Sequence, residues 1–188
     1  KLNVPRIGVR FRLPASMNQV EYFGRGPAEN YLDRNAGSMV GLYKSTAEEL
    51  YFPYVRPQEN GHHTDTRWVS LSTGKKGLLI QADNTIGFNA LRNSIEDFDD
   101  EEATGLSRQW SNFTPEQVAN HDEAAAKNVL RRQHHINDIT PRDFVEVCVD
   151  LKQQGVAGYD SWGSRPEPAY TLPANREYNW GFTLIPLK

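Results

Sequence analysis

"RIGVRFRL", at residues 6–13, decides the fold, because apolar and polar side chains alternate along it. Alternate residues of a β-strand point to opposite faces of the sheet. One face would carry the apolar residues Ile7, Val9, Phe11 and Leu13, and the other the basic residues Arg6, Arg10 and Arg12. The pattern predicts a half-buried antiparallel strand.

Short runs of the same kind follow along the rest of the chain, separated by clusters of Gly, Pro, Asn and Asp. They are "QVEYFG", "SMVGLY", "RWVSLS", "GLLIQA", "GFNALR", "FVEVCVDL" and "YNWGFTLI". Many short strands joined by turn-forming residues are typical of a β-sandwich. The sequence therefore predicts an all-β fold.

One segment breaks this pattern with a helix signal. Thr114 can cap the helix, Pro115 suits its first position and Gln117 completes a capping box. The run "DEAAAKNVLRR" then continues with strong helix formers. For the acidic run "SIEDFDDEE" before it, we favour a solvated loop or a helix entry over a metal site, because it lacks a glycine-bent cation loop.

Composition bounds the class of protein. The 188 residues fit one domain, and the net charge of -3 gives no long-range field for nucleic acid or an anionic membrane. No apolar run approaches the ~20 residues that span a bilayer. The single cysteine, Cys148, excludes an intrachain disulfide framework, and we predict a structural thiol. The compartment stays open between cytoplasm and periplasm.

The chain shows no signal-peptide pattern and no initiating methionine, and it opens almost directly on a strand. We interpret it as a piece of a longer polypeptide. It has no glycine-rich phosphate loop, no nucleophile elbow and no CxxC motif. The adjacent pairs His62-His63 and His134-His135 would point to opposite faces of a strand, so neither pair easily chelates one metal ion.

A tryptophan stands at the tip of a polar loop in "GVAGYDSWGSRPEP", residues 155–168. Gly155 and Gly158 allow sharp turns, and Asp160 and Ser161 can hydrogen-bond the loop's own amides. A large ring there buries little surface against its neighbours. Trp162 is therefore either a cap on the sandwich edge or a surface that something else covers. The residues alone suggest a β-sandwich with aromatic-bearing polar loops and a possible role in sugar binding.

Five motifs identify a resemblance that covers nearly the whole chain. In order, "PRIGVRF", "EYFGRGPAENYLDR", "YFPYVRPQENGHHTDTRW", "FNALRNS" and "QQGVAGYDSWG" resemble the C-terminal domain of the large bacterial β-galactosidases of glycoside hydrolase family 2. Residues 1–188 would form part of that final domain. Residues 95–131, with the acidic run and the helix signal, look like an insertion.

The resemblance implies an antiparallel β-supersandwich, similar to the galactose mutarotase-like folds, with one short helical insertion. In that family of retaining enzymes the catalytic glutamates and the Mg²⁺ ligands belong to a separate (β/α)8 barrel. The resemblance therefore implies no catalytic residue, no metal ligand and no cofactor in this chain, which alone should be inactive. It also implies that Trp162 of the "DSW" motif covers one face of the sugar at the aglycone side, with Asp160 and Ser161 supporting the loop.

The segment "RPQENGHHTDTRW" is a second, weaker candidate for contacting the sugar. Its functional interpretation has Glu59, Asn60, His62 or Arg67 near the site, reaching sugar hydroxyls. We favour a structural turn in which Glu59, Asp65 and Arg67 satisfy one another and the backbone. The segment "GPAENYLDR" is likewise predicted to be a hydrogen-bonded corner rather than a site.

Two classes of function follow. The first is a carbohydrate-binding accessory domain of a β-galactosidase, which completes the aglycone side of the site and supports assembly. Its partners would be a β-galactoside or another sugar, the remaining domains of the parent chain and a second copy in a homo-oligomer, with no nucleic acid and no membrane. The alternative is a free-standing mutarotase-like enzyme or carbohydrate-binding module, and the enzyme would need a histidine and a carboxylate in one pocket.

Overall fold

The computed structural model describes residues 2–55, 57–98, 136–160 and 162–188. These residues form an all-β structure, as the sequence predicts. The strands are β1 (Arg6–Pro14), β2 (Gln19–Gly26), β3 (Met39–Thr46), β4 (His63–Ser72), β5 (Gly77–Leu91), β6 (Phe144–Gln153) and β7 (Phe182–Leu187). Three short 3-10 helices accompany them in the described residues: η1 (Ile95–Asp97), η3 (Ile136–Asp138) and η4 (Pro168–Tyr170).

The chain divides into two compact units. The first comprises Lys1–Phe52, Asn60–Asn93 and Pro141–Lys188, and it holds all seven strands. The second comprises Pro53–Glu59 and Ser94–Thr140. The predicted insertion at 95–131 falls within the second unit, where η1 spans part of the acidic run. The helix predicted from Thr114 onward lies outside the described residues.

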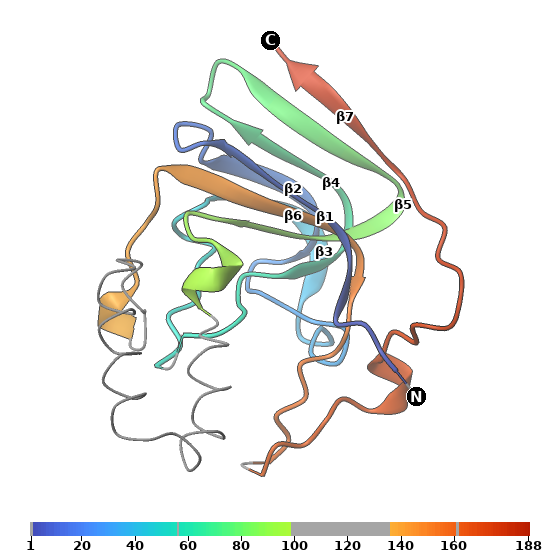
Figure 1. Ribbon diagram of the computed structural model, residues 1–188. Helices are drawn as coiled ribbons and strands as arrows, with labels where there is room; N and C mark the ends of the chain where they lie inside the picture. The colour runs from blue at the N-terminus through green and yellow to red at the C-terminus, as the bar shows by residue number, and fades with distance from the viewer. Residues whose placement is uncertain (1, 56, 99–135, 161) are drawn as a thin grey trace, which may run out of the picture. The chain divides into compact units, whose positions relative to one another are not determined.

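The strands of the first unit form one antiparallel sheet in the order β1-β6-β5-β4-β2-β3, with β7 paired to β5. This arrangement is consistent with a β-sandwich. Two segments predicted as separate strands, "GLLIQA" and "GFNALR", join into the 15-residue strand β5. Figure 1 shows β5 curving along its length. Its first part pairs with β7 and its last part, Gly87–Leu91, pairs with β6.

The core follows from the alternation of side chains, with one exception on β6. Its apolar residues Val145, Val147 and Val149 are fully buried, as the pattern predicts. The polar residues Glu146 and Asp150, which alternate with this series, are also buried, and arginines of β1 pair with them. The predicted apolar face of β1 is less buried than expected, and Val9 is 46% exposed. None of the helices among the described residues is both long and apolar enough to cross a membrane.

Candidate functional site

The Trp162 loop, residues 155–164, follows β6 in the first unit. Its backbone takes positive φ at Ala157 (55°), Gly158 (82°) and Gly163 (83°). Two of these positions are glycines, which adopt such angles without steric cost. The loop presents Trp162 with 94% of its surface exposed and Tyr159 with 58% exposed. The described chain therefore leaves the indole open to solvent.

Hydrogen bonds within the loop centre on Asp160. Its Oδ1 accepts from the amides of Trp162, at 2.8 Å, and Ser164, at 3.4 Å. The Ser164 hydroxyl in turn accepts from the amide of Tyr159 at 3.0 Å. The bonds that the sequence predicts for Asp160 are thus present, and Ser161 lies outside the described residues. An aspartate bonded two residues ahead forms an Asx turn, which fixes the backbone beside the tryptophan.

The segment "GPAENYLDR" forms the hydrogen-bonded corner that its sequence predicts. Asn30 is buried, and its Oδ1 accepts from both the amide and the hydroxyl of Thr64. Glu29 accepts from the amide of Gly61 at 2.6 Å. The corner is therefore attached to the start of β4. One contact was not predicted: the carboxylate of Asp33 accepts from backbone amides of the Trp162 loop.

Asn60 and His62, two of the weaker candidates, lie in the interior. Asn60 is 2% exposed, and its Oδ1 accepts from the amide of Phe52 at 3.1 Å. His62 is 1% exposed, and its Nδ1 lies 2.8 Å from the Oδ1 of Asn89. Burial, followed by the charge of Arg6, lowers the pKa of His62 to about 3. The ring is thus neutral at pH 7, and in this chain both side chains serve the fold.

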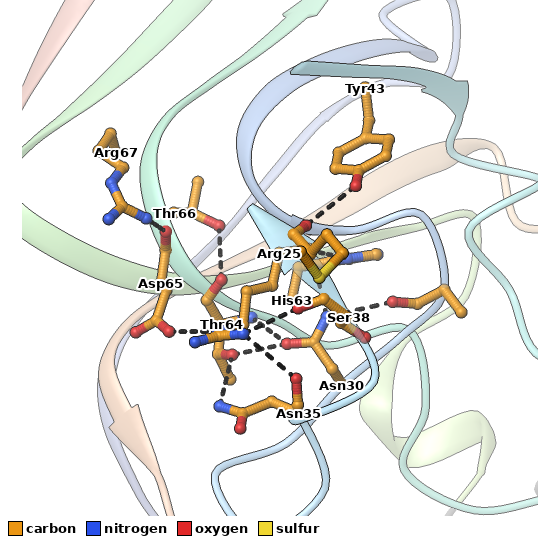
Figure 2. A network of polar contacts seen from close by, with 12 residues as sticks. Arg25, Asn30, Asn35, Ser38, Tyr43, His63, Thr64, Asp65, Thr66 and Arg67 are labelled. Atoms are coloured by element: carbon orange, nitrogen blue, oxygen red, sulfur yellow. Dashed lines mark hydrogen bonds and ion pairs between the residues drawn. The ribbon is translucent and has the colours of Figure 1, made fainter. Parts of the chain in front are cut away.

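Arg67 and Asp65 belong to a polar network around Arg25, which Figure 2 shows. The carboxylate of Asp65 pairs with the guanidinium of Arg25, and Arg67 donates to the backbone carbonyl of Asp65. Asp65 has a φ of 51° at a shift in the β4–β5 register, which is typical of a bulge. The predicted contact between Arg67 and Asp65 is therefore present, whereas Glu59 belongs to the second unit.

A buried polar cluster of Arg6, His62, Asn89 and Asp150 lies on β1, β5, β6 and the residue before β4. The Nη2 of Arg6 donates to the Oδ1 of Asn89 at 2.7 Å, and its Nε lies 3.0 Å from the Oδ2 of Asp150. His62 approaches the same carboxylate at 3.9 Å. Because His62 is neutral, the ion pair in this cluster is the one between Arg6 and Asp150.

His62, just before β4, and His63, the first residue of β4, contact two neighbouring residues of β5, Asn89 and Phe88 respectively. His63 stacks on Phe88 with ring centroids 5.1 Å apart, and its Nδ1 lies 3.0 Å from the carbonyl of Arg25. Burial lowers the pKa of His63 to about 4. Within the part of the chain that the structure describes, no group of three or more His, Cys, Asp or Glu side chains is arranged to hold a metal ion.

Comparisons with known proteins identify relatives of this chain. Residues 1–184 match the family described as "Beta galactosidase small chain". A protein named "Beta-galactosidase" from Priestia megaterium is 35% identical over 185 residues, which cover 98% of this chain and 15% of that protein. Proteins of the same name from Arthrobacter sp. and Vibrio cholerae are 42% identical over 99 residues and 29% identical over 181 residues. These two matches cover 50% and 96% of this chain, and 10% and 14% of the relatives. The chain thus spans a small part of the curated relatives it matches.

Proposed function

The chain belongs to the beta-galactosidase small-chain family, and on this premise we propose that it forms the aglycone side of the active site of a β-galactosidase. In this proposal Trp162 is a platform for one face of the sugar, and Asp160 supports the loop. The full-length protein that contains the chain is called the parent enzyme below. Its catalytic glutamates and its Mg²⁺ ligands would lie in a separate barrel domain, and this chain alone would hydrolyse no β-galactoside.

One observation carries the proposal: the indole of Trp162 is 94% exposed within the "DSW" motif on which the resemblance rests. One face of a pyranose consists mainly of C–H groups, so an indole beneath it removes apolar area from water. The hydroxyl groups stay free for polar partners on the other domains. An exposed tryptophan held on a hydrogen-bonded loop fits this role, because little of its ring must be uncovered before sugar binds.

The polar candidates divide by burial. Asn60 and His62 are almost completely buried, so neither is exposed to a sugar in this chain. Arg67 is half-buried and is held by the carbonyl of Asp65, which leaves it and Glu59 as weaker candidates for sugar hydroxyls. We therefore assign the direct contact in this chain to Trp162.

Assembly is the second part of the proposal. β1 and β3 end the path of the sheet, so each pairs on one side only within the described residues. Such edges present free backbone donors and acceptors to another strand. We propose that the remaining domains of the parent enzyme, or a second copy in a homo-oligomer, cover them.

The alternative enzyme, a mutarotase-like protein, needs a histidine and a carboxylate that both reach the sugar. His62 and Asp150 approach each other to 3.9 Å, but their side chains are only 2% and 1% exposed. Both belong to the buried polar cluster, whose contacts within the sheet account for their position. The accessory domain is therefore the function that we propose.

The test is Trp162→Ala in the parent enzyme. Losing part of an aromatic contact worth on the order of 1–2 kcal/mol should raise KM for 2-nitrophenyl β-galactoside and the Kd of isopropyl β-D-thiogalactoside by roughly fivefold to thirtyfold. kcat should fall less, because the groups that stabilise the transition state lie elsewhere.

Two further variants control this test. Trp162→Phe should recover part of the affinity, since a smaller flat ring remains. Leu184→Ala removes another exposed apolar side chain, on β7, and should leave KM unchanged. Unchanged KM and thiogalactoside binding in a correctly assembled Trp162→Ala enzyme would refute the platform.

A further inference from the structure

We infer that Asp33 is a positioning residue for the Trp162 loop, acting through the backbone amides at its base. The inference rests on the proposed function of Trp162 and deepens it by naming what holds the platform in place. Asp33 lies in the corner "GPAENYLDR", more than 120 positions from the loop in sequence. Asp33 would therefore affect sugar binding only indirectly, through the position of Trp162.

The carboxylate of Asp33 uses one oxygen for each of two consecutive amides. Its Oδ1 accepts from the amide of Val156 at 3.1 Å, and its Oδ2 accepts from the amide of Ala157 at 2.8 Å. Hydrogen bonds from amides to an ionised carboxylate are about twice as strong as those between neutral groups. The two amides belong to consecutive peptide planes, so rotation of either plane would break one of the two bonds. The bonds therefore fix the direction of the backbone at this point.

The base of the loop is shaped to admit this carboxylate. A Cβ atom at Gly155 would lie 2.5 Å from the Oδ2 of Asp33, so a larger residue would push the carboxylate away. The hydroxyl of Tyr159 also lies 3.5 Å from the same oxygen. Desolvation, followed by the negative charge of Asp33, raises the pKa of Tyr159, so the phenol stays protonated at neutral pH and can donate.

Asp33 is itself held on a rigid turn. The backbones of Tyr31 and Arg34 exchange two hydrogen bonds, of 3.3 and 2.8 Å, which close the turn around Asp33. Tyr31 is 1% exposed and stacks on His62 with ring centroids 5.5 Å apart. The guanidinium of Arg34 makes a second contact with the ring, at 5.0 Å from the Tyr31 centroid. The turn is thus anchored in the buried polar cluster.

These contacts form a continuous path from the core to the platform. His62 supports Tyr31, Tyr31 closes the turn, and Asp33 bonds the loop at residues 156–157. The Oδ1 of Asp160 then accepts a hydrogen bond from the amide of Trp162. Side chains that bind a ligand need such a supporting shell to hold their geometry. If Asp33 served only the stability of the fold, its two carboxylate oxygens would not both need to bind amides of the loop that carries the exposed tryptophan.

The experiment compares Asp33→Ala and Asp33→Asn with Asp143→Asn in the parent enzyme. Asp143 is an exposed aspartate just before β6 and serves as the matched control. Hydrogen–deuterium exchange of the peptide covering residues 154–160 should be roughly tenfold faster or more in Asp33→Ala, because loss of the bonds lets the loop open locally. Asp33→Asn should show a smaller increase and Asp143→Asn none.

Binding of isopropyl β-D-thiogalactoside gives a second readout. Asp33→Ala should weaken it by about threefold to tenfold, less than Trp162→Ala, because a mobile platform still visits the bound position. KM should rise more than kcat falls. In the Trp162→Ala background, Asp33→Ala should cause no further loss of affinity for the thiogalactoside. Asp33 affects binding only by positioning the indole, which this background lacks. Equal losses in both backgrounds would overturn the inference.

The two proposals fail in different ways. If exchange at residues 154–160 is unchanged in Asp33→Ala, Asp33 does not hold the loop and the inference is wrong, whatever Trp162 does. If exchange rises while Trp162→Ala binds thiogalactoside normally, Asp33 holds the loop but the platform of the proposed function is wrong. Gly155→Ala gives an independent check with Asp33 intact, and it should also raise exchange, since the added Cβ displaces the carboxylate.

Discussion

The buried polar cluster and the Trp162 loop use polar side chains for opposite purposes. In the cluster, Arg6 and Asp150 form an ion pair inside the sheet, and a neutral histidine lies beside them. In the loop, Asp33 and Asp160 bind backbone amides and leave an aromatic ring almost fully in water. Removing one member of the ion pair in the cluster leaves the other charge buried. Removing a carboxylate that binds the loop leaves backbone amides that water can reach.

This difference separates stability from binding. Changes in the cluster should lower the free energy of unfolding and affect sugar binding mainly through loss of the fold. Changes in the loop should affect sugar binding at nearly constant stability. The separation can be measured in variants of the parent enzyme.

The largest effect is expected for Asp150→Ala. This change leaves the guanidinium of Arg6, whose side chain is 19% exposed, without its carboxylate partner. Removing one member of a buried ion pair typically lowers the free energy of unfolding by about 3–5 kcal/mol. Urea denaturation, followed by a spectroscopic probe of this domain, should show the loss.

Arg12→Ala is the matched control for this prediction. Arg12 is half exposed and pairs with Glu146, which keeps a second partner in Arg10 at 3.3 Å. Its removal should lower the free energy of unfolding less than Asp150→Ala does, because Arg10 stays paired with the buried Glu146 and water can reach the position of the Arg12 guanidinium. Equal losses in Asp150→Ala and Arg12→Ala would contradict the special position of the cluster.

The second prediction concerns pH. Burial lowers the pKa of His62 to about 3 and that of His63 to about 4, from 6.5 in the unfolded chain. The unfolded chain therefore binds protons first as the pH falls. Stability from these histidines is fully present above pH 6.5 and is lost as the pH falls toward the folded pKa values, by at most about 1.4 kcal/mol per pH unit for each histidine.

Urea midpoints between pH 8 and pH 4.5 test this expectation. His62→Gln removes one of the titrating groups, so its free energy of unfolding should fall less steeply below pH 6.5 than that of the unchanged enzyme. If the free energy of unfolding depended on pH in the same way in both proteins, His62 would not titrate as its burial requires.

The alternation of residues predicted most of the sheet, because one strand face must be apolar wherever it packs on a core. The pattern could not reveal that the polar side of β6 is buried too. That burial depends on arginines of β1, which are more than 130 positions away from Glu146 in sequence. For the same reason His62 looked like a loop residue in "GHH", although it fills the interior beside Asn89.

In the candidate site, local geometry was predictable and distant geometry was not. The bonds of Asp160 span two and four residues, so the sequence alone suggests them. Asp33 reaches its amides across 123 and 124 positions, and a single aspartate in "YLDR" carries no periodic signal. Gly155 was expected only to allow a turn. The structure adds a steric reason for it, since a side chain there would meet Asp33.

The third prediction uses strain to move the loop alone. Gly158 has a φ of 82°, and, apart from its chain neighbours, no atom of the described residues lies within 4 Å of the position that a Cβ would take. Gly158→Ala is therefore strained by its backbone. The strain should be about 1 kcal/mol, and its relief by a shift of the loop should weaken thiogalactoside binding by roughly threefold to fivefold. Gly37→Ala, equally uncrowded but without a positive φ, is the control. An equal loss of thiogalactoside affinity in Gly37→Ala and Gly158→Ala would contradict an effect local to the loop.

The smallest effect is expected for Asp160, and it separates hydrogen bonding from charge. Asp160→Asn keeps an Oδ1 that can accept from the amides of Trp162 and Ser164, whereas Asp160→Ala removes the acceptor. Because water competes for these exposed amides, Asp160→Ala should weaken thiogalactoside binding only about twofold to threefold, with the urea midpoint unchanged. Asp160→Asn should bind like the unchanged enzyme, since asparagine forms the same Asx turn. If Asp160→Asn lost as much affinity as Asp160→Ala, the negative charge itself would be the contribution of Asp160. The loop would then act on the sugar through charge as well as through the position of Trp162.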